Sequence, residues 1–352
     1  MRIEPPLWDI DPYMPATWRV LAVLLHDMPL CQADIREQTG LSHPVVVQQI
    51  AQLRRVGLVN VGQSASGKPG RPRIPVSFNW NFARLLAVEV HRSGLTLQAT
   101  NLSGDPITEP RTVKLSDWSQ EGIRHSLLKH IRQSMSTPGP RWAGVGIVLP
   151  GTVSNDGQTV SSCLDIPDWV EQALGEDLSI ELGLPVMLEN EVDALARATW
   201  LDRPENTQTL IAISLRHNHR VAMGLMAEGN QRACACGNLG SLETLLCESQ
   251  KDPAIRQQTL EALAATINNV VMAIRPELLV IQGDAQWSQA DMAIIQQSVN
   301  ENCPPDVLQG LQLMDRPYGA SESLLGAVHI LVSRIMSRRD GVLLDWVKSV
   351  QA

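Results

Sequence analysis

The order strand, turn, strand, helix and buried strand occurs twice in the chain, and this repeat constrains the fold more than any other feature. Residues 84–107 and 209–229 read as hairpins, because short apolar runs flank turn-forming residues in each. A helical pattern and a buried strand follow both hairpins, and the strands are "WAGVGIVLPG" (142–151) and "RPELLVIQGD" (275–284). Strands that alternate with helices predict an α/β fold. We therefore expect two related halves with a cleft between them.

Length and composition indicate a protein of two or three domains. The chain has 352 residues, of which 44% are hydrophobic. It holds no uncharged apolar run of membrane-spanning length, and its acidic, proline-rich start lacks the apolar core of a signal peptide. The six cysteines are scattered apart from one close pair, which is typical of free thiols in a reducing compartment. These features predict a cytoplasmic protein with no membrane partner.

The charge is unevenly distributed. Residues 1–76 hold eight of the 29 basic and six of the 37 acidic residues, so this part has a net charge of +2 and the remainder −10. Within it, residues 54–73 carry five cations and no acid. A basic end on an acidic body favours a polyanionic partner for that end alone. A solvated charge cluster is the alternative explanation.

Residues 1–78 carry the pattern of a winged helix-turn-helix. Residues 16–27 have apolar side chains at helical spacing, a second helical run ends at Gly40, and Ser42 can cap a third helix. The third helix has one apolar stripe, made of Val46, Ile50 and Leu53. Two short strands around "QSASGKPGRPR" (63–73) complete the pattern as a hairpin, the wing.

The third helix and the wing are the candidate DNA-binding elements. With the stripe facing inward, the other side chains of the helix face outward, where Gln can pair with adenine and Val can contact a thymine methyl. The wing cations lie in a Gly-Arg-Pro sequence that resembles an AT-hook, whose arginines enter narrow minor grooves. We expect A/T-rich duplex DNA as partner, whereas packing of the helix on the rest of the chain is the alternative. The predicted contacts are Ser42, His43, Val45, Gln48, Gln49, Gln52, Arg54, Lys68, Arg71 and Arg73.

Six stretches between residues 67 and 285 follow one another in the order found in the ROK family of sugar kinases and sugar-responsive repressors. They are "GRPRIPVSFN", "GVGIVLPGTV", "LDIPDW", "ELGLPVMLENEVDALARA", "CACGNLGSLETLL" and "RPELLVIQGD". The resemblance implies a bilobed, actin/hexokinase-like body. We expect a first lobe over 79–200, completed by C-terminal helices at about 320–352, and a second lobe over 201–319. The winged helix in front resembles the repressor branch, which implies a homodimer or homotetramer.

The sequence departs from the family's kinases at four places. The first phosphate turn reads "VEVHRSGLT" (88–96), where the kinases have paired glycines that approach phosphate. The second turn, "SLRHNHRVAMG" (214–224), holds histidines and arginines in place of small residues. Glu191 replaces the catalytic Asp, and Gly283-Asp284 replaces a Gly-Gly pair. We therefore expect no kinase activity, no catalytic residue and no cofactor.

The stretch "RACACGNLGSLE" (232–243) resembles the family's structural zinc site but is incomplete. Cys234 and Cys236 match two of its ligands, whereas Ser241 stands at the third cysteine and the segment with the histidine is missing. Because a closed zinc site needs four nitrogen or sulfur ligands, we expect a remnant without metal. A site rebuilt with Cys247 is the alternative.

The effector pocket is also reduced. Asn190, Glu191 and Glu243 match sugar-contacting positions of the family, but the missing segment removes two further sugar contacts. We expect a DNA-binding transcriptional regulator, a repressor in carbohydrate metabolism, whose pocket no longer senses a simple hexose through the family's contacts. Three alternatives stay open: a sugar kinase with a DNA-binding arm, a regulator that retains sugar binding, and a regulator controlled by a protein partner.

Overall fold

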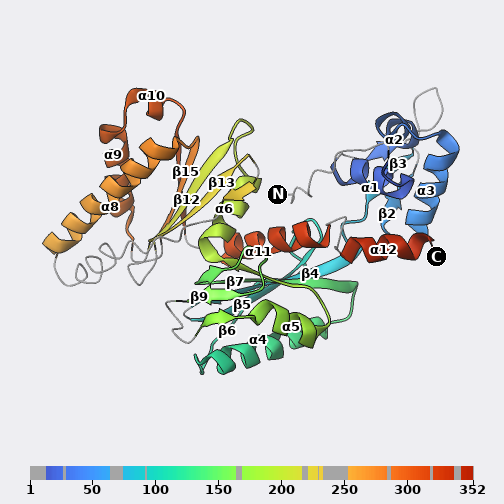
Figure 1. Cartoon of the computed structure of the whole chain (residues 1–352), viewed down its shortest axis with the longest axis horizontal. Helices are drawn as coiled ribbons and strands as arrows, with labels where there is room; N and C mark the ends of the chain where they lie inside the picture. The colour runs from blue at the N-terminus through green and yellow to red at the C-terminus, as the bar shows by residue number, and fades with distance from the viewer. Residues whose placement is uncertain are drawn as a thin grey trace.

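The computed structural model describes residues 13–26, 29–63, 74–91, 93–163, 169–215, 221–228, 230–232, 253–283, 287–317, 320–336 and 342–351. It contains an N-terminal module and two five-stranded sheets with helices on their faces (Figure 1). Within the described part of the chain, every helix is too short or too polar to traverse a lipid bilayer.

The N-terminal module consists of three helices and a small antiparallel sheet in the order β1-β3-β2. Val46, Ile50 and Leu53 are buried, as their spacing predicts, and Gly40 ends the second helix in the left-handed conformation with φ 66°. Ser42 occupies the N-cap position of the third helix without a side-chain capping bond. The elements are α1 (Ala16–His26), β1 (Leu30–Cys31), α2 (Gln32–Thr39), α3 (His43–Arg55), β2 (Val59–Val61) and β3 (Pro75–Phe78).

The first large sheet has the order β11-β7-β4-β5-β6, in which β4 pairs antiparallel with β5 and parallel with β7. Helices α4 and α5 cover one face of it, and α11 (Ala320–Ile335) covers the other (Figure 1). Its other elements are β4 (Ala83–His91), β5 (Gly94–Asn101), β6 (Arg111–Val113), α4 (Gln120–Met135), β7 (Arg141–Leu149), α5 (Leu174–Leu182) and β11 (Val186–Asn190). A small sheet beside it joins β8 (Thr152–Val153), β9 (Val160–Ser162) and β10 (Val170–Gln172).

The second large sheet repeats the strand order and directions of the first, as β16-β15-β12-β13-β14. Helices α8 and α9 pack on one face of it, and α6 (Glu191–Leu201) packs on the other. The predicted repeat of strand and helix order is therefore confirmed. The remaining elements are β12 (Thr209–Leu215), β13 (Val221–Ala227), β14 (Asn230–Arg232), α8 (Pro253–Ile274), β15 (Leu278–Gly283), α9 (Gln289–Asn302), α10 (Pro305–Leu308) and β16 (Gln312–Pro317).

The backbones of helices α6 and α11 are in direct contact. A Cβ atom on Gly326 of α11 would lie 2.3 Å from the carbonyl oxygen of Ala194 in α6. On its other side, α11 touches the first sheet, since a Cβ on Gly146 of β7 would lie 2.3 Å from the Ala327 carbonyl oxygen. Because glycine alone leaves room for these contacts, backbone lies directly on backbone at both places.

The C-terminal helix α12 (Val342–Gln351) joins the body to the N-terminal module. It follows α11 and contacts α3 (Figure 1). Trp346 of α12 meets Phe82, just before β4, in an edge-to-face ring contact with centroids 5.0 Å apart. One buried apolar cluster runs from the N-terminal module through β4 to α11 and α12. The module and the first sheet therefore share a hydrophobic core.

Candidate nucleic-acid interface and effector site

Helix α3 presents one solvent-exposed face that carries no acidic side chain. His43, Val45 and Gln52 are half-buried, whereas Gln48 and Arg54 are exposed. The exposed positions on the helix and at its cap are Ser42, Pro44, Val47, Gln48, Ala51, Arg54 and Arg55. Cations at the last turn also suit the negative end of the helix dipole. The exposed face therefore suits an anionic partner.

The expected outward orientation of Gln49 is wrong. Its side-chain oxygen accepts a hydrogen bond of 2.6 Å from the hydroxyl of Thr17 in α1. Gln49 lies immediately beside the buried stripe, and α1 packs along that side of the helix. Val45, one turn before Gln49 on the same flank, is also half-buried, whereas Val47 on the other flank is 40% exposed. Sequence reasoning missed Val47 and Ala51, although a helical projection centred on the stripe would have found them.

The three predicted wing cations, Lys68, Arg71 and Arg73, lie outside the described residues. The strands that flank this loop are described: Val61 of β2 is paired with Val76 of β3, and the Gly62 amide donates to the Pro75 carbonyl at 2.8 Å. The described residues on the two sides of the wing segment therefore lie next to each other in this sheet.

Asn190, a predicted sugar contact, is tied into the backbone at both ends of its amide. Its Nδ2 donates to the Gly151 carbonyl at 2.6 Å, and its Oδ1 accepts from the Val192 amide at 2.9 Å. The side chain is 6% exposed. It caps α6 and fixes the turn after β7 against the end of β11. This arrangement places the turn next to the start of α6, where Glu191 is half-buried.

A buried ion pair stands beside Asn190 and was not anticipated from the sequence. The Glu189 carboxylate lies 2.7 Å from Nε of Arg197, two turns along α6. It also accepts a hydrogen bond of 3.2 Å from the backbone N–H of Asn190. Glu189 is 5% exposed. The signal in the sequence was an acid directly after the apolar residues of the strand "VMLEN". The pair fixes the direction in which α6 leaves the strand.

The hairpin at the first phosphate-turn position is closed by its own polar side chains. Nε2 of His91 lies 2.8 Å from the Thr96 hydroxyl, and Nδ1 lies 2.9 Å from the Ser93 hydroxyl. The Thr96 hydroxyl also lies 3.1 Å from that of Thr112 in β6. These polar side chains therefore bond to one another, within the hairpin and across to β6.

Several predicted positions cannot be placed. Residues 216–220 of the second phosphate turn lie outside the described residues, as do Asp284, Glu243, Ser241 and the cysteines Cys234, Cys236 and Cys247. Among the residues that are described, no three His, Cys, Asp or Glu side chains come together as metal ligands. Cys31, Cys163 and Cys303 are buried, and burial raises the pKa of the Cys303 thiol.

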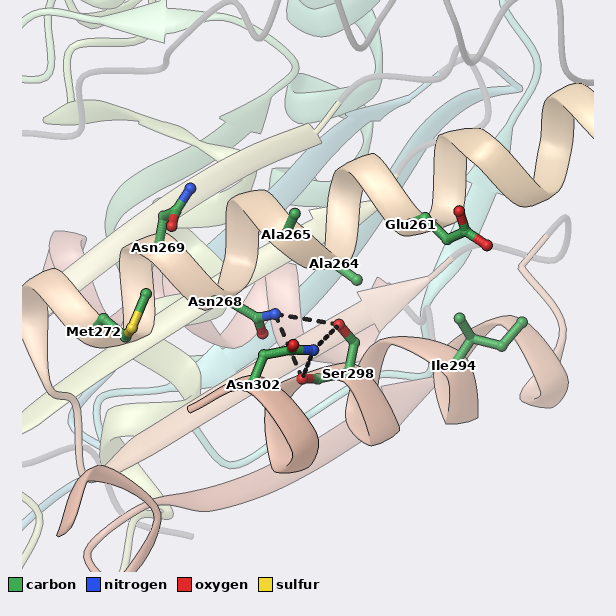
Figure 2. Close-up of a pocket in the computed structure, with 9 residues that line it drawn as sticks. All are labelled: Glu261, Ala264, Ala265, Asn268, Asn269, Met272, Ile294, Ser298 and Asn302. Atoms are coloured by element: carbon green, nitrogen blue, oxygen red, sulfur yellow. Dashed lines mark hydrogen bonds between the residues drawn. The ribbon is translucent and has the colours of Figure 1, made fainter. Parts of the chain in front are cut away.

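A groove of about 360 Å³ runs between α8 and α9 on the second sheet (Figure 2). Asn268 is 5% exposed there, and its Nδ2 lies 3.2 Å from the Ser298 hydroxyl. Nδ2 of Asn302 donates to the Ser298 carbonyl at 2.8 Å. The bond from Asn268 joins α8 to α9 beneath the groove, whereas the bond from Asn302 lies within α9. None of the predicted site residues lines it.

Residues 86–217 match the family model described as the ROK family. This part of the chain is therefore similar to a ROK family domain. It is 25% identical over 252 residues to a putative xylose repressor of Caldicellulosiruptor sp. (strain Rt8B.4) and 23% identical over 251 residues to the xylose repressor of Bacillus subtilis (strain 168). Each alignment covers 65% of this chain, but only 63% and 65% of the two relatives, which is less than two thirds of their length.

Solved ROK structures share the fold. A ROK family transcriptional regulator, a homologue of E. coli Mlc, has a TM-score of 0.72 at 20% identity, and the match covers 98% of this chain and 100% of that protein. A ROK hexokinase from Thermus thermophilus has a TM-score of 0.53 at 15% identity, and it covers 70% of this chain and 97% of the enzyme. The α/β fold is thus that of the ROK regulators and kinases.

Proposed function

We propose that this ROK protein is a transcriptional repressor that binds A/T-rich duplex DNA through a winged helix-turn-helix formed by residues 1–78. One observation carries the proposal: α3, on the N-terminal three-helix module, exposes an acid-free face that ends in Arg54 and Arg55. The names of the relatives, xylose repressor and Mlc, support the same conclusion. The fold likeness over 98% of the chain also favours the regulator over the hexokinase, which covers 70%.

In this proposal α3 enters the major groove. His43, Gln48 and Gln52 reach base edges, while Arg54 and Arg55 contact phosphates. The wing cations Lys68, Arg71 and Arg73 enter the adjacent minor groove, which is narrow and strongly negative in A/T-rich DNA. A homodimer or homotetramer presents two such helices to half-sites one helical turn, or a multiple of it, apart.

The body, with one lobe over 79–200 plus the C-terminal helices and another over 201–319, is the regulatory part. Its effector, a sugar-like molecule or a protein, binds near the start of α6, where Glu191 supplies a polar contact. Glu243, the other predicted contact, lies outside the described residues. A kinase reaction is not part of the proposal, because His91 and its hydroxyl partners occupy the hairpin that would approach phosphate.

The proposal is tested by fluorescence anisotropy with short A/T-rich duplexes at about 50 and 200 mM salt. The wild type binds, and its affinity falls with salt. Arg54→Ala and Arg55→Ala each weaken binding and lower the slope of log affinity against log salt by about one. Lys129→Ala, which removes an exposed cation from α4, is the matched control and leaves both quantities unchanged. Failure of the wild type to bind any such duplex at low salt would exclude this function.

A further inference from the structure

The exposed face of α3 includes an apolar strip. Val47 and Ala51 are four residues apart and therefore neighbours on the helix surface, and Pro44 lies one turn before Val47. All three are exposed, Val47 by 40%. They lie beside Gln48, on the far side of the helix from the buried Val46, Ile50 and Leu53. Within the described chain, the strip stays open to solvent although α1, α2 and α12 all pack against α3.

A helix face that only contacts water usually carries charged or polar side chains, so an exposed apolar strip suggests a binding role for this face. The chain does place cations on α3, but only at its last turn. The strip, with Gln48 beside it, thus presents methyl groups and one side-chain amide. It precedes the last turn, where Arg54 and Arg55 are proposed to contact phosphates. In the major groove, a thymine presents its C5 methyl and an adenine presents a donor and an acceptor that Gln matches.

We propose that Val47 and Ala51 recognise thymine methyl groups in the major groove, with Gln48 on a neighbouring adenine. The inference rests on the proposed function and adds to it the residues that set the preference for A·T pairs in the major groove. Val47 takes the role first expected of Val45, whose side chain is half-buried. The preference is then read by α3 itself, independently of the wing cations in the minor groove.

Charge and size both favour DNA over a protein as the occupant of this face. Arg54 and Arg55 continue the face and suit an anionic partner. The strip offers one large apolar side chain, Val47, whereas a specific protein interface buries about 800 Å² on each partner. Protein docking predicts no sensitivity to the bases of a duplex, so a base-specific measurement separates the two.

The test compares A/T-rich duplexes with the same duplexes in which deoxyuridine replaces every thymidine, which removes only the C5 methyl groups. Binding is measured for wild type, Val47→Ala and Ile180→Ala. The wild type binds the uridine duplex about fourfold more weakly for each methyl contact that is lost, the equivalent of one buried methylene. Val47→Ala binds the thymidine duplex more weakly and loses most of this discrimination.

Ile180→Ala is the matched control, because Ile180 is a β-branched side chain, 73% exposed on α5, far from α3 in the sequence. It keeps the wild-type ratio between the two duplexes. Val47→Ala folds normally, since alanine is the better helix former at an exposed position, and circular dichroism checks this. Equal wild-type affinity for both duplexes, or an unchanged ratio in Val47→Ala, overturns the inference while the proposed function stands. A wild type that binds neither duplex overturns both.

Discussion

Gly326→Ala in α11 is expected to destabilise the protein, against the usual effect of this substitution in a helix. Alanine in a helix interior is favoured over glycine by about 1 kcal/mol, so the helix alone would gain stability. The new Cβ, however, would lie 2.3 Å from the carbonyl oxygen, 2.5 Å from Cα and 2.6 Å from the carbonyl carbon of Ala194. These are backbone atoms, which no change of rotamer can move away.

The size of the effect follows from these two opposing contributions. Relief of the contact requires α11 and α6 to separate, and overpacking of a well-filled core costs about 1–3 kcal/mol. Since the contact is with backbone and α11 is held on its other side by Gly146, we take the upper end of that range. With the gain of about 1 kcal/mol from helix propensity, the free energy of unfolding falls by about 2 kcal/mol.

Urea denaturation followed by circular dichroism measures this change as a lower midpoint. Gly310→Ala is the control, because a Cβ at Gly310 meets no atom within 4 Å and the backbone there is not left-handed. That substitution is neutral or stabilises by about 0.4–1 kcal/mol. If Gly326→Ala proved as stable as the wild type, the backbone contact between α6 and α11 would not be as close as described.

Two further substitutions test the surroundings of the candidate effector site. Arg197→Met removes the guanidinium beside the buried Glu189 carboxylate and should lower the free energy of unfolding by about 3 kcal/mol, whereas Arg132→Met, in an exposed pair, should change it by less than about 1 kcal/mol; equal effects in urea titrations would argue against a buried pair. Asp156 accepts hydrogen bonds from the Ser154 hydroxyl and the Gln158 amide, which lower the pKa of its carboxyl. A lowered folded-state pKa contributes stability above the unfolded-state value of about 3.9 that is lost as the pH falls through the folded-state pKa. Asp156→Ala should therefore lower the melting temperature at pH 7, and the difference from wild type should shrink on acidification below about pH 4; a difference independent of pH would contradict this assignment.

Local patterns in the sequence predicted the N-terminal module well. The stripe of Val46, Ile50 and Leu53, the stop at Gly40 and the proline in the first turn of α3 depend on neighbouring residues, and the structure confirms each. The repeated order of hairpin, helix and strand was also visible, because each half must build the same sheet from consecutive elements.

Contacts between distant segments could not be predicted. The bond from Thr17 to Gln49 depends on where α1 lies against α3, and the bond from Asn190 to Gly151 spans 39 residues. The role of Glu189 likewise depends on the angle between β11 and α6, which brings Arg197 alongside it. Periodicity reports which side of an element is buried but not which neighbour buries it.

The edge-to-face contact of Phe82 with Trp346 has a consequence for protein engineering. Because the end of the chain supports the beginning of the first sheet and touches α3, the front module cannot be grafted onto another regulator as a free-standing cassette. A chimera that exchanges only the first 78 residues would pair a new module with a foreign C-terminal helix. Successful hybrids must carry both ends of the polypeptide together.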